Sequence, residues 1–299
     1  MSTLPPFDLM NERLANGERL SSAELTELIR APDILQIGML ADTCRRRLRE
    51  DVVTFLRVAT RPCDRAAEEG VSPAARELRM TGTPVSLKGA LDAIGEAKVR
   101  ARDRTIAGFS WRDVTRLAAA DGMPAGQILA TLRAAGLDSL LELPLDLDED
   151  LVPALDQVCG AGFDQLRVTV ERMPAAERTP LLLRLEAWQE RHGRVQTLSP
   201  LPTVLQAFRP TTGYEDVRAV AVARLAAPQI PMIQVDWARY GPKLAQVALT
   251  FGADDLDAVS SATDAPDGPR RAPIEELRRN VVAAGLIPAE RDGHFSLIA

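Results

Sequence analysis

The sequence predicts an α/β protein built on a parallel barrel of strands and helices, and three observations support this class. Short apolar segments alternate with amphipathic segments through most of the chain, which is typical of a parallel sheet with helices outside it. The length of 299 residues suits one barrel-sized domain. No second hydrophobic core is visible. We therefore expect one domain over residues 1–299, with an N-terminal helical segment at 1–50, the barrel at 51–258, and a C-terminal loop and helix at 259–299.

The composition excludes several classes of protein. The chain has 36 basic and 42 acidic residues, and its net charge of -6 provides no field for nucleic acid or an anionic membrane, so we expect neither partner. Its first residues lack a leader pattern, and no apolar run approaches the ~20 residues of a membrane helix. Three widely spaced cysteines argue against a disulfide framework and predict reduced thiols and a cytoplasmic location.

The first elements are a helix and a strand. Apolar residues spaced by three and four follow Asp33 as far as Leu48, which predicts a helix with Cys44 on its buried face. The β-branched and aromatic run 52–56 predicts a strand. Glycine and proline interrupt residues 60–82, so we expect a long, mobile connection there.

The alternation then continues to the end of the chain. The Thr212–Glu215 segment has the S/T-x-x-E pattern of a capping box, which predicts a reciprocal cap on the helix it opens. The predicted helices cover 87–99, 124–135, 150–159, 175–192, 214–226, 243–251 and 274–284, and the predicted strands cover 105–109, 139–143, 166–170, 195–198 and 231–235.

Familiar catalytic motifs are missing from the sequence. It has no glycine-rich dinucleotide or P-loop motif, and His192 and His294 lie in no recognisable triad pattern. Two acidic runs remain, and they could bind Mg²⁺ or supply an acid and a base, although such runs more often cap helices or face solvent. They are Asp146, Asp148, Glu149 and Asp150, and then Asp254, Asp255 and Asp257.

Several segments together carry a family resemblance, most specifically in the C-terminal part. They are residues 17–21, 40–48, 129–139, 218–225, 230–234 with Trp237, 241–257 and 284–292. These segments resemble the radical S-adenosylmethionine (radical SAM) enzymes of the futalosine route to menaquinone, aminofutalosine synthase and dehypoxanthine futalosine cyclase. The resemblance implies a TIM-like barrel with N-terminal and C-terminal helical extensions, a four-iron, four-sulfur cluster and bound S-adenosylmethionine.

The sequence departs from that family where its cofactors bind. The family's CxxxCxxC motif supplies three thiolates to the cluster, but here the matching segment 59–67 contains only Cys63, at most a remnant. A bulky segment, 140–145, stands where the family has its glycine-rich strand end. Residues 99–106 are too few for the strand and helix that the family carries there, so we expect an incomplete barrel lacking about one strand–helix unit.

These departures predict a non-catalytic radical-SAM-like paralogue in menaquinone biosynthesis, a partner, regulator or metabolite binder that has lost both the cluster and S-adenosylmethionine. Two alternatives remain open: an enzyme with cluster-independent chemistry in the old barrel pocket, or a radical SAM enzyme that holds its cluster through other ligands. We expect no catalytic residue and no metal ligand. The expected partners are a second copy of the chain, an active radical SAM relative or a small nucleoside. Ligands of such barrels bind at the mouth, the end of the barrel where the carboxyl ends of the strands lie. The ligand-binding residues expected there are Gln234, Asp236, Asp254 and Asp255.

Overall fold

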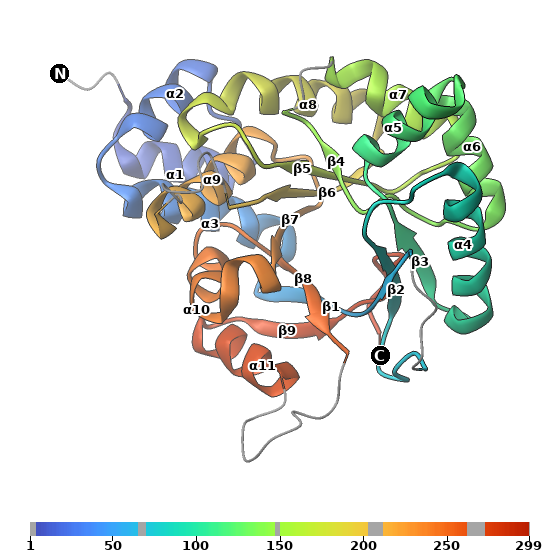
Figure 1. The fold of residues 1–299 in the computed structure, drawn as a ribbon. Helices are drawn as coiled ribbons and strands as arrows, with labels where there is room; N and C mark the ends of the chain where they lie inside the picture. The colour runs from blue at the N-terminus through green and yellow to red at the C-terminus, as the bar shows by residue number, and fades with distance from the viewer. Residues whose placement is uncertain (1–3, 65–69, 147–149, 203–211, 262–272, 299) are drawn as a thin grey trace.

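The computed structural model describes residues 4–64, 70–146, 150–202, 212–261 and 273–298. Eight parallel strands curve into a barrel-like sheet, and helices cover its outside (Figure 1). The predicted class, an incomplete parallel barrel with helical extensions, is confirmed for these residues. None of the described helices is both long and apolar enough to cross a membrane.

The N-terminal extension consists of three helices packed beside the barrel. They are α1 (Phe7–Ala15), α2 (Ser22–Arg30) and α3 (Ile34–Arg49). The Ser21 hydroxyl accepts a hydrogen bond from the amide of Glu24, whose carboxylate accepts one from the amide of Ser21, so α2 begins with a reciprocal cap. Helix α3 buries Cys44, as its apolar spacing predicts.

The strands follow the order β3-β2-β1-β8-β7-β6-β5-β4, and every neighbouring pair is parallel. No ladder joins β3 to β4. Only isolated bridges, Ala107 with Ser139 and Ser110 with Glu142, span that gap, so the sheet is not closed by continuous pairing among the described residues. The strands are β1 (Val52–Pro62), β2 (Glu77–Thr81), β3 (Thr105–Gly108), β4 (Leu143–Pro144), β5 (Leu166–Val170), β6 (Val195–Pro200), β7 (Met232–Asp236) and β8 (Asp255–Ser260).

Helices follow most of the strands in sequence. Helix α10 contains a kink at Gly241, just before Pro242. The helices are α4 (Leu87–Ala101), α5 (Trp111–Asp121), α6 (Ala125–Ala135), α7 (Leu151–Gly160), α8 (Thr179–His192) with the short 3₁₀ turn η1 (Ala175–Glu177) before it, α9 (Gly213–Ala226), α10 (Trp237–Leu249) and α11 (Pro273–Ala283).

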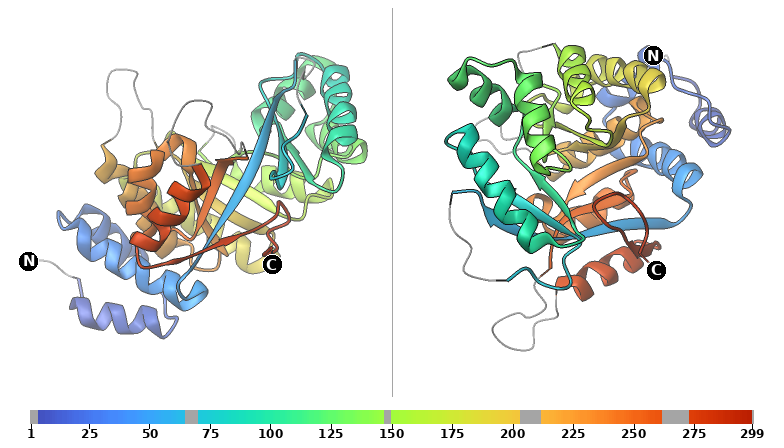
Figure 2. Two further views of the ribbon diagram at one scale, coloured as in Figure 1. Left: turned by 90° about the horizontal axis from the view of Figure 1, so that it is seen from below. Right: turned by 90° about the vertical axis from the view of Figure 1, so that its right-hand side faces the viewer.

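A ninth strand brings the C-terminal segment back to the first one. Strand β9 (Ile287–Glu290) pairs in parallel with Val52–Phe55, while β2 pairs with Val58–Pro62 farther along β1. Figure 2 shows the long β1 running from the N-terminal helices toward β2 and α4. The C-terminal residues therefore lie at the amino end of the barrel.

Three sequence predictions about elements were wrong. The stretch 60–82 is not one mobile connection, because it contains the end of β1 and all of β2. Strand β8 was missed because its alternating aspartates resemble a loop. Thr212 makes no side-chain cap on α9, so the predicted capping box does not form.

The expected loss of a strand–helix unit at residues 99–106 is also wrong. Residues 102–104 form an ordinary short connection from α4 to β3, and the eight strands occupy consecutive places in the sheet. In the described part of the chain, it is β1 that has no helix between it and the next strand. The eight consecutive strands therefore contradict the expected loss of a strand–helix unit after α4.

Candidate functional site

The inside of the barrel is polar. In parallel strands, neighbouring residues in register point to the same face, and alternate residues along a strand share a face. Glu77 pairs in register with Thr105, Arg167 with Thr197, and Gln234 with Asp255. A buried parallel strand is usually apolar throughout. These strands instead place polar side chains inside and apolar ones, such as Leu78 and Val168, against the helices.

Charged side chains cross the barrel and contact one another. Arg167 on β5 donates two hydrogen bonds to the carboxylate of Glu77 on β2, two strands that are not neighbours in the sheet. Arg79 donates to Glu77 at 2.5 Å and to Asp257 on β8. Burial opposes ionisation of both acids, but the facing arginines hold the pKa values of Glu77 and Asp257 below their usual range. The network is therefore ionised.

The C-terminal segment adds to this network from the amino end of the barrel. The fully buried guanidinium of Arg291 donates to both carboxylate oxygens of Asp255, at 2.6 and 2.7 Å. The carbonyl of Gly293 accepts from Arg167 at 3.2 Å. The ring of Phe295 lies under both guanidinium groups, 4.4 Å from that of Arg291 and 5.3 Å from that of Arg167. The segment thus seals the amino end of the barrel.

The four residues predicted to line the mouth are not gathered there. Asp254 and Asp255 lie at the start of β8, the end opposite the mouth. Gln234 donates to Asp255 at 2.7 Å inside the barrel, while Asp254 accepts from Arg224 at 2.6 Å on the helix side. Only Asp236 stands at a carboxyl end of a strand, where it caps α10. The expectation that the four share one mouth was therefore wrong, because Asp254 and Asp255 begin β8 instead of following a strand, and as adjacent residues they point to opposite faces.

Inside the barrel, several buried polar atoms have no hydrogen-bond partner among the residues that the structure describes. Arg167 Nε is one of them, and the others are hydroxyls on interior-facing positions of the barrel wall. Buried polar groups are nearly always satisfied by protein, water or ligand, so these atoms mark candidate places for a polar molecule. The hydroxyl atoms are Thr105 Oγ1, Ser139 Oγ, Thr169 Oγ1 and Thr197 Oγ1.

The three thiols lie in separate surroundings. Cys63 follows β1 near Asp64 and Asp113. Cys44 is buried on α3 near Arg224, whereas Cys159 on α7 is near Arg194. In the described part of the chain, no group of three or more His, Cys, Asp or Glu residues is arranged to hold a metal ion.

The other candidates have structural roles. Asp146 accepts hydrogen bonds from the amides of Glu171, Arg172 and Met173, and Asp150 caps α7. The ring of His192 stacks on Trp188 with centroids 4.3 Å apart. The backbone of His294 donates to Asp292 and accepts from Gln165. Asp148 and Glu149 lie outside the described residues.

Sequence reasoning missed the residues that define the interior. Glu77, Arg79, Arg167 and Arg291 were not singled out, although a signal for most of them was present. Alternation of one polar with one apolar residue recurs at 77–79, 167–169, 234–236 and 255–257, and it indicates strands with one polar face.

The fold places the chain in a class of known barrels. It resembles methylornithine synthase (PylB), with a TM-score of 0.65 at 12% identity over 94% of this chain and 97% of that one. It also resembles the FeFe-hydrogenase maturase HydG, with a TM-score of 0.67 at 15% identity over 95% of this chain and 75% of that one. At these identities the likeness concerns the fold alone, a parallel barrel of strands and helices.

Sequence comparisons identify a similar family region and similar enzymes. The model of the CofH/MqnC C-terminal region matches residues 196–298. The 5-amino-6-(D-ribitylamino)uracil–L-tyrosine 4-hydroxyphenyl transferase of Archaeoglobus fulgidus is 28% identical over 223 residues, covering 64% of this chain and 64% of the relative. Aminodeoxyfutalosine synthase of Thermus thermophilus is 28% identical over 58% of this chain and 55% of the relative. The same enzyme of Streptomyces coelicolor is 23% identical over 97% of this chain and 93% of the relative.

Residues 196–298 thus resemble the CofH/MqnC C-terminal region, as the C-terminal segments predict, and the chain is similar to the enzymes named above. The matches to the first two relatives span less than two thirds of their length.

Proposed function

We propose that this chain is a non-catalytic radical-SAM-like paralogue whose barrel binds a metabolite and which acts as a partner or regulator of an active relative. Its likeness to aminodeoxyfutalosine synthases associates that role with menaquinone biosynthesis by the futalosine pathway. The observation that carries the proposal is the position of the three thiols.

The cysteines do not fit the family's cluster. A cluster of this type uses three thiolates of one loop and leaves one iron open for the cofactor. The chain has three cysteines in all, and they lie after β1, within α3 and at the end of α7. Burial raises the pKa of the Cys44 thiol to about 11 and also raises the pKa of Cys63, which opposes thiolate formation.

The unpartnered interior atoms support binding of a polar metabolite. These atoms are neutral or cationic hydrogen-bond donors, and no acceptor among the described residues pairs with them. They are the hydroxyls of Ser139, Thr169 and Thr197, and Arg167 Nε. Ribose hydroxyls and base edges of a nucleoside are complementary to such a set. We expect a nucleoside to bind among these interior hydroxyls rather than through Asp254 or Asp255.

Anaerobic reconstitution with iron and sulfide tests the loss of radical chemistry. We expect the protein to remain colourless and to retain far fewer than the roughly four irons per chain of a complete cluster. A Cys63→Ala variant should retain the same small amount of iron as the wild type. Stoichiometric iron that disappears in this variant would refute the proposal.

Thermal unfolding with futalosine-type nucleosides tests metabolite binding. We expect a saturable increase in the unfolding temperature that is lost in a Thr169→Val, Thr197→Val double variant. Both substitutions keep side-chain shape and remove only the hydroxyls. Equal shifts in the two proteins, or none at saturating ligand, would contradict nucleoside binding at these hydroxyls.

The partner role has its own test. Light scattering should show a second copy bound, or an aminodeoxyfutalosine synthase of the same cell should co-purify with the chain. A monomer that retains no such relative would contradict this part of the proposal.

A further inference from the structure

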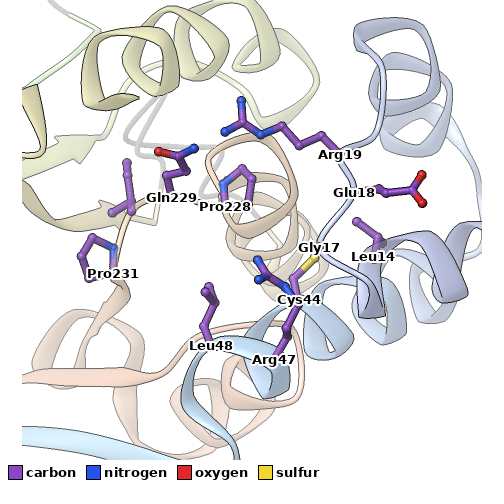
Figure 3. Close-up of a pocket in the computed structure, with 11 residues that line it drawn as sticks. Leu14, Gly17, Glu18, Arg19, Cys44, Arg47, Leu48, Pro228, Gln229 and Pro231 are labelled. Carbon is purple, nitrogen blue, oxygen red and sulfur yellow. The ribbon is translucent and has the colours of Figure 1, made fainter. Parts of the chain in front are cut away.

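A cavity of about 400 Å³ lies at the amino end of the barrel, opposite the mouth. Its walls come from the loop between α1 and α2, from α3, and from the loop between α9 and β7 (Figure 3). The volume is within the usual range of small-molecule sites. The lining residues include Leu14, Gly17, Arg19, Cys44, Arg47 and Gln229.

Two arginines face this cavity. The guanidinium of Arg47 lies against the α-carbon of Gly17, where a Cβ would approach its Nη1 to 3.3 Å, and Gly17 has a φ of +84°. Within the described residues, Arg47 has no ion pair. Arg19 extends over Pro228 and Gln229 in Figure 3, lies 3.3 Å from Glu186 and also forms an ion pair with Glu190. Arg47 therefore presents a positive charge that the surrounding side chains leave uncompensated.

The acidic groups near the cavity do not cancel this charge. The carboxylate of Glu18 turns away from the cavity in Figure 3 and pairs with Arg13 at 3.4 Å. Burial raises the pKa of Glu186 to about 7, so its negative charge is only partial at neutral pH. The thiol of Cys44 is buried and neutral, with its pKa raised to about 11.

The rest of the wall is apolar. Leu14 and Leu48 come from the helices, and Pro228, Ile230 and Pro231 come from the loop before β7. Apolar walls with a few directed polar groups are the usual composition of a site for a small organic molecule. Two guanidinium groups at one side favour an oxyanion, since each offers paired N–H donors that match carboxylate and phosphate oxygens.

We propose that this cavity binds a small organic molecule that has an apolar body and an oxyanion group, a carboxylate or a phosphate, held between Arg19 and Arg47. The site is separate from the interior hydroxyls of the barrel. Its existence does not depend on nucleoside binding or on the absence of a cluster.

Titration calorimetry with three probes tests the site: phenyl phosphate, benzoate and inorganic phosphate. We expect saturable binding of phenyl phosphate or benzoate to the full-length protein, and weaker binding of inorganic phosphate, which lacks the apolar body. The comparison between phenyl phosphate and benzoate identifies which oxyanion the site prefers.

Two variants of neighbouring arginines provide the matched comparison. Arg47→Gln should weaken binding at least about tenfold, because it removes a charge-assisted contact. Arg46→Gln should leave binding unchanged, since Arg46 is on the same helix but pairs with Asp42 and does not line the cavity. Circular dichroism should show both variants folded.

A Leu48→Ser variant separates the two halves of the proposal. Leu48 is 37% exposed, so the substitution should leave the fold intact. It should weaken phenyl phosphate binding and leave inorganic phosphate binding unchanged. The proposal is overturned if neither organic probe binds saturably, or if Arg47→Gln and Arg46→Gln affect binding equally.

Discussion

Arg291 and Asp255 form an ion pair whose side chains are both completely buried. Because removing one member of such a pair leaves the other charge without compensation, Arg291→Gln should lower the free energy of unfolding by about 3–5 kcal/mol. Urea unfolding measures the effect. The double variant Arg291→Gln, Asp255→Asn should be more stable than the single one, since it leaves no buried charge unpaired.

The control for this prediction is an exposed pair. Glu275 lies 3.8 Å from Arg278, and both side chains are about half exposed. Glu275→Gln should change the free energy of unfolding by less than about 0.5 kcal/mol. Similar effects of Arg291→Gln and Glu275→Gln would contradict the role assigned to the buried pair.

Glu186 is a second residue whose burial has a measurable consequence. Burial raises its pKa from 4.5 to about 7, against the opposing effects of the Gln229 amide, Arg19 and Arg224, while Glu190 adds to the rise. A raised acid pKa means that the folded state binds the proton more tightly than the unfolded state. The resulting stabilisation is complete below pH 4.5 and is lost as the pH rises to about 7.

A Glu186→Gln variant removes this dependence. Between pH 4.5 and 7, the wild type should lose roughly 1–3 kcal/mol of stability relative to the variant. Denaturant unfolding at several pH values measures the difference. The exposed Glu276→Gln control should follow the wild type, and a constant difference between wild type and Glu186→Gln would disprove the raised pKa.

At the scale of elements, the C-terminal segment is the closure of the barrel's amino end. Gly293 passes so close to β2 and β3 that a Cβ would lie 1.8 Å from Thr105 Oγ1 and 2.8 Å from Glu77 Oε2. Gly293→Ala should therefore displace the segment and cost about 1–3 kcal/mol or more. Limited proteolysis should cleave the segment faster in this variant.

The matched control for Gly293 is a glycine with open space around it. Gly95 lies in the exposed face of α4, and nothing lies within 4 Å of its Cβ position. Gly95→Ala should stabilise the helix by roughly 0.5–1 kcal/mol. If both alanine variants had the same stability and the same cleavage rate, the C-terminal segment would not be packed as described.

At the scale of the whole molecule, carboxylates paired with arginines should determine acid stability. Hydrogen bonding to Arg13 lowers the pKa of Glu24 to about 2, and facing arginines lower those of Glu77, Asp257 and Glu290, although burial opposes the last three shifts. An acid with a lowered pKa stabilises the folded state above its unfolded pKa. That stabilisation is lost as the pH falls through the folded value.

We therefore expect cooperative acid unfolding that begins below about pH 4.5 and is advanced by pH 2. Circular dichroism and tryptophan fluorescence follow the transition. Adding salt should shift it little, because the Glu77 and Asp257 pairs are buried and weakly screened. An unchanged denaturant midpoint at pH 2 would contradict the prediction.

Local sequence patterns were sufficient to predict the class of fold and the position of most helices. Strand β5 has the predicted bounds, and α6 ends at Gly136 as its spacing indicates. These elements depend on local periodicity and on glycine at a left-handed position, both of which are visible in a short window of sequence. The family resemblance of the C-terminal segments was likewise a property of the sequence.

Which polar residues contact one another depends on the three-dimensional arrangement of the strands. Asp254 and Asp255 are neighbours in sequence, yet one pairs with Arg224 outside the barrel and the other with Arg291 inside it. Glu77 and Arg167 are 90 residues apart and touch across the interior. Local periodicity gives the alternation of faces along a strand, but the register between strands and the return of the chain end fix which charges share a buried space. That arrangement follows from the need to pair every charge that the closing barrel removes from water.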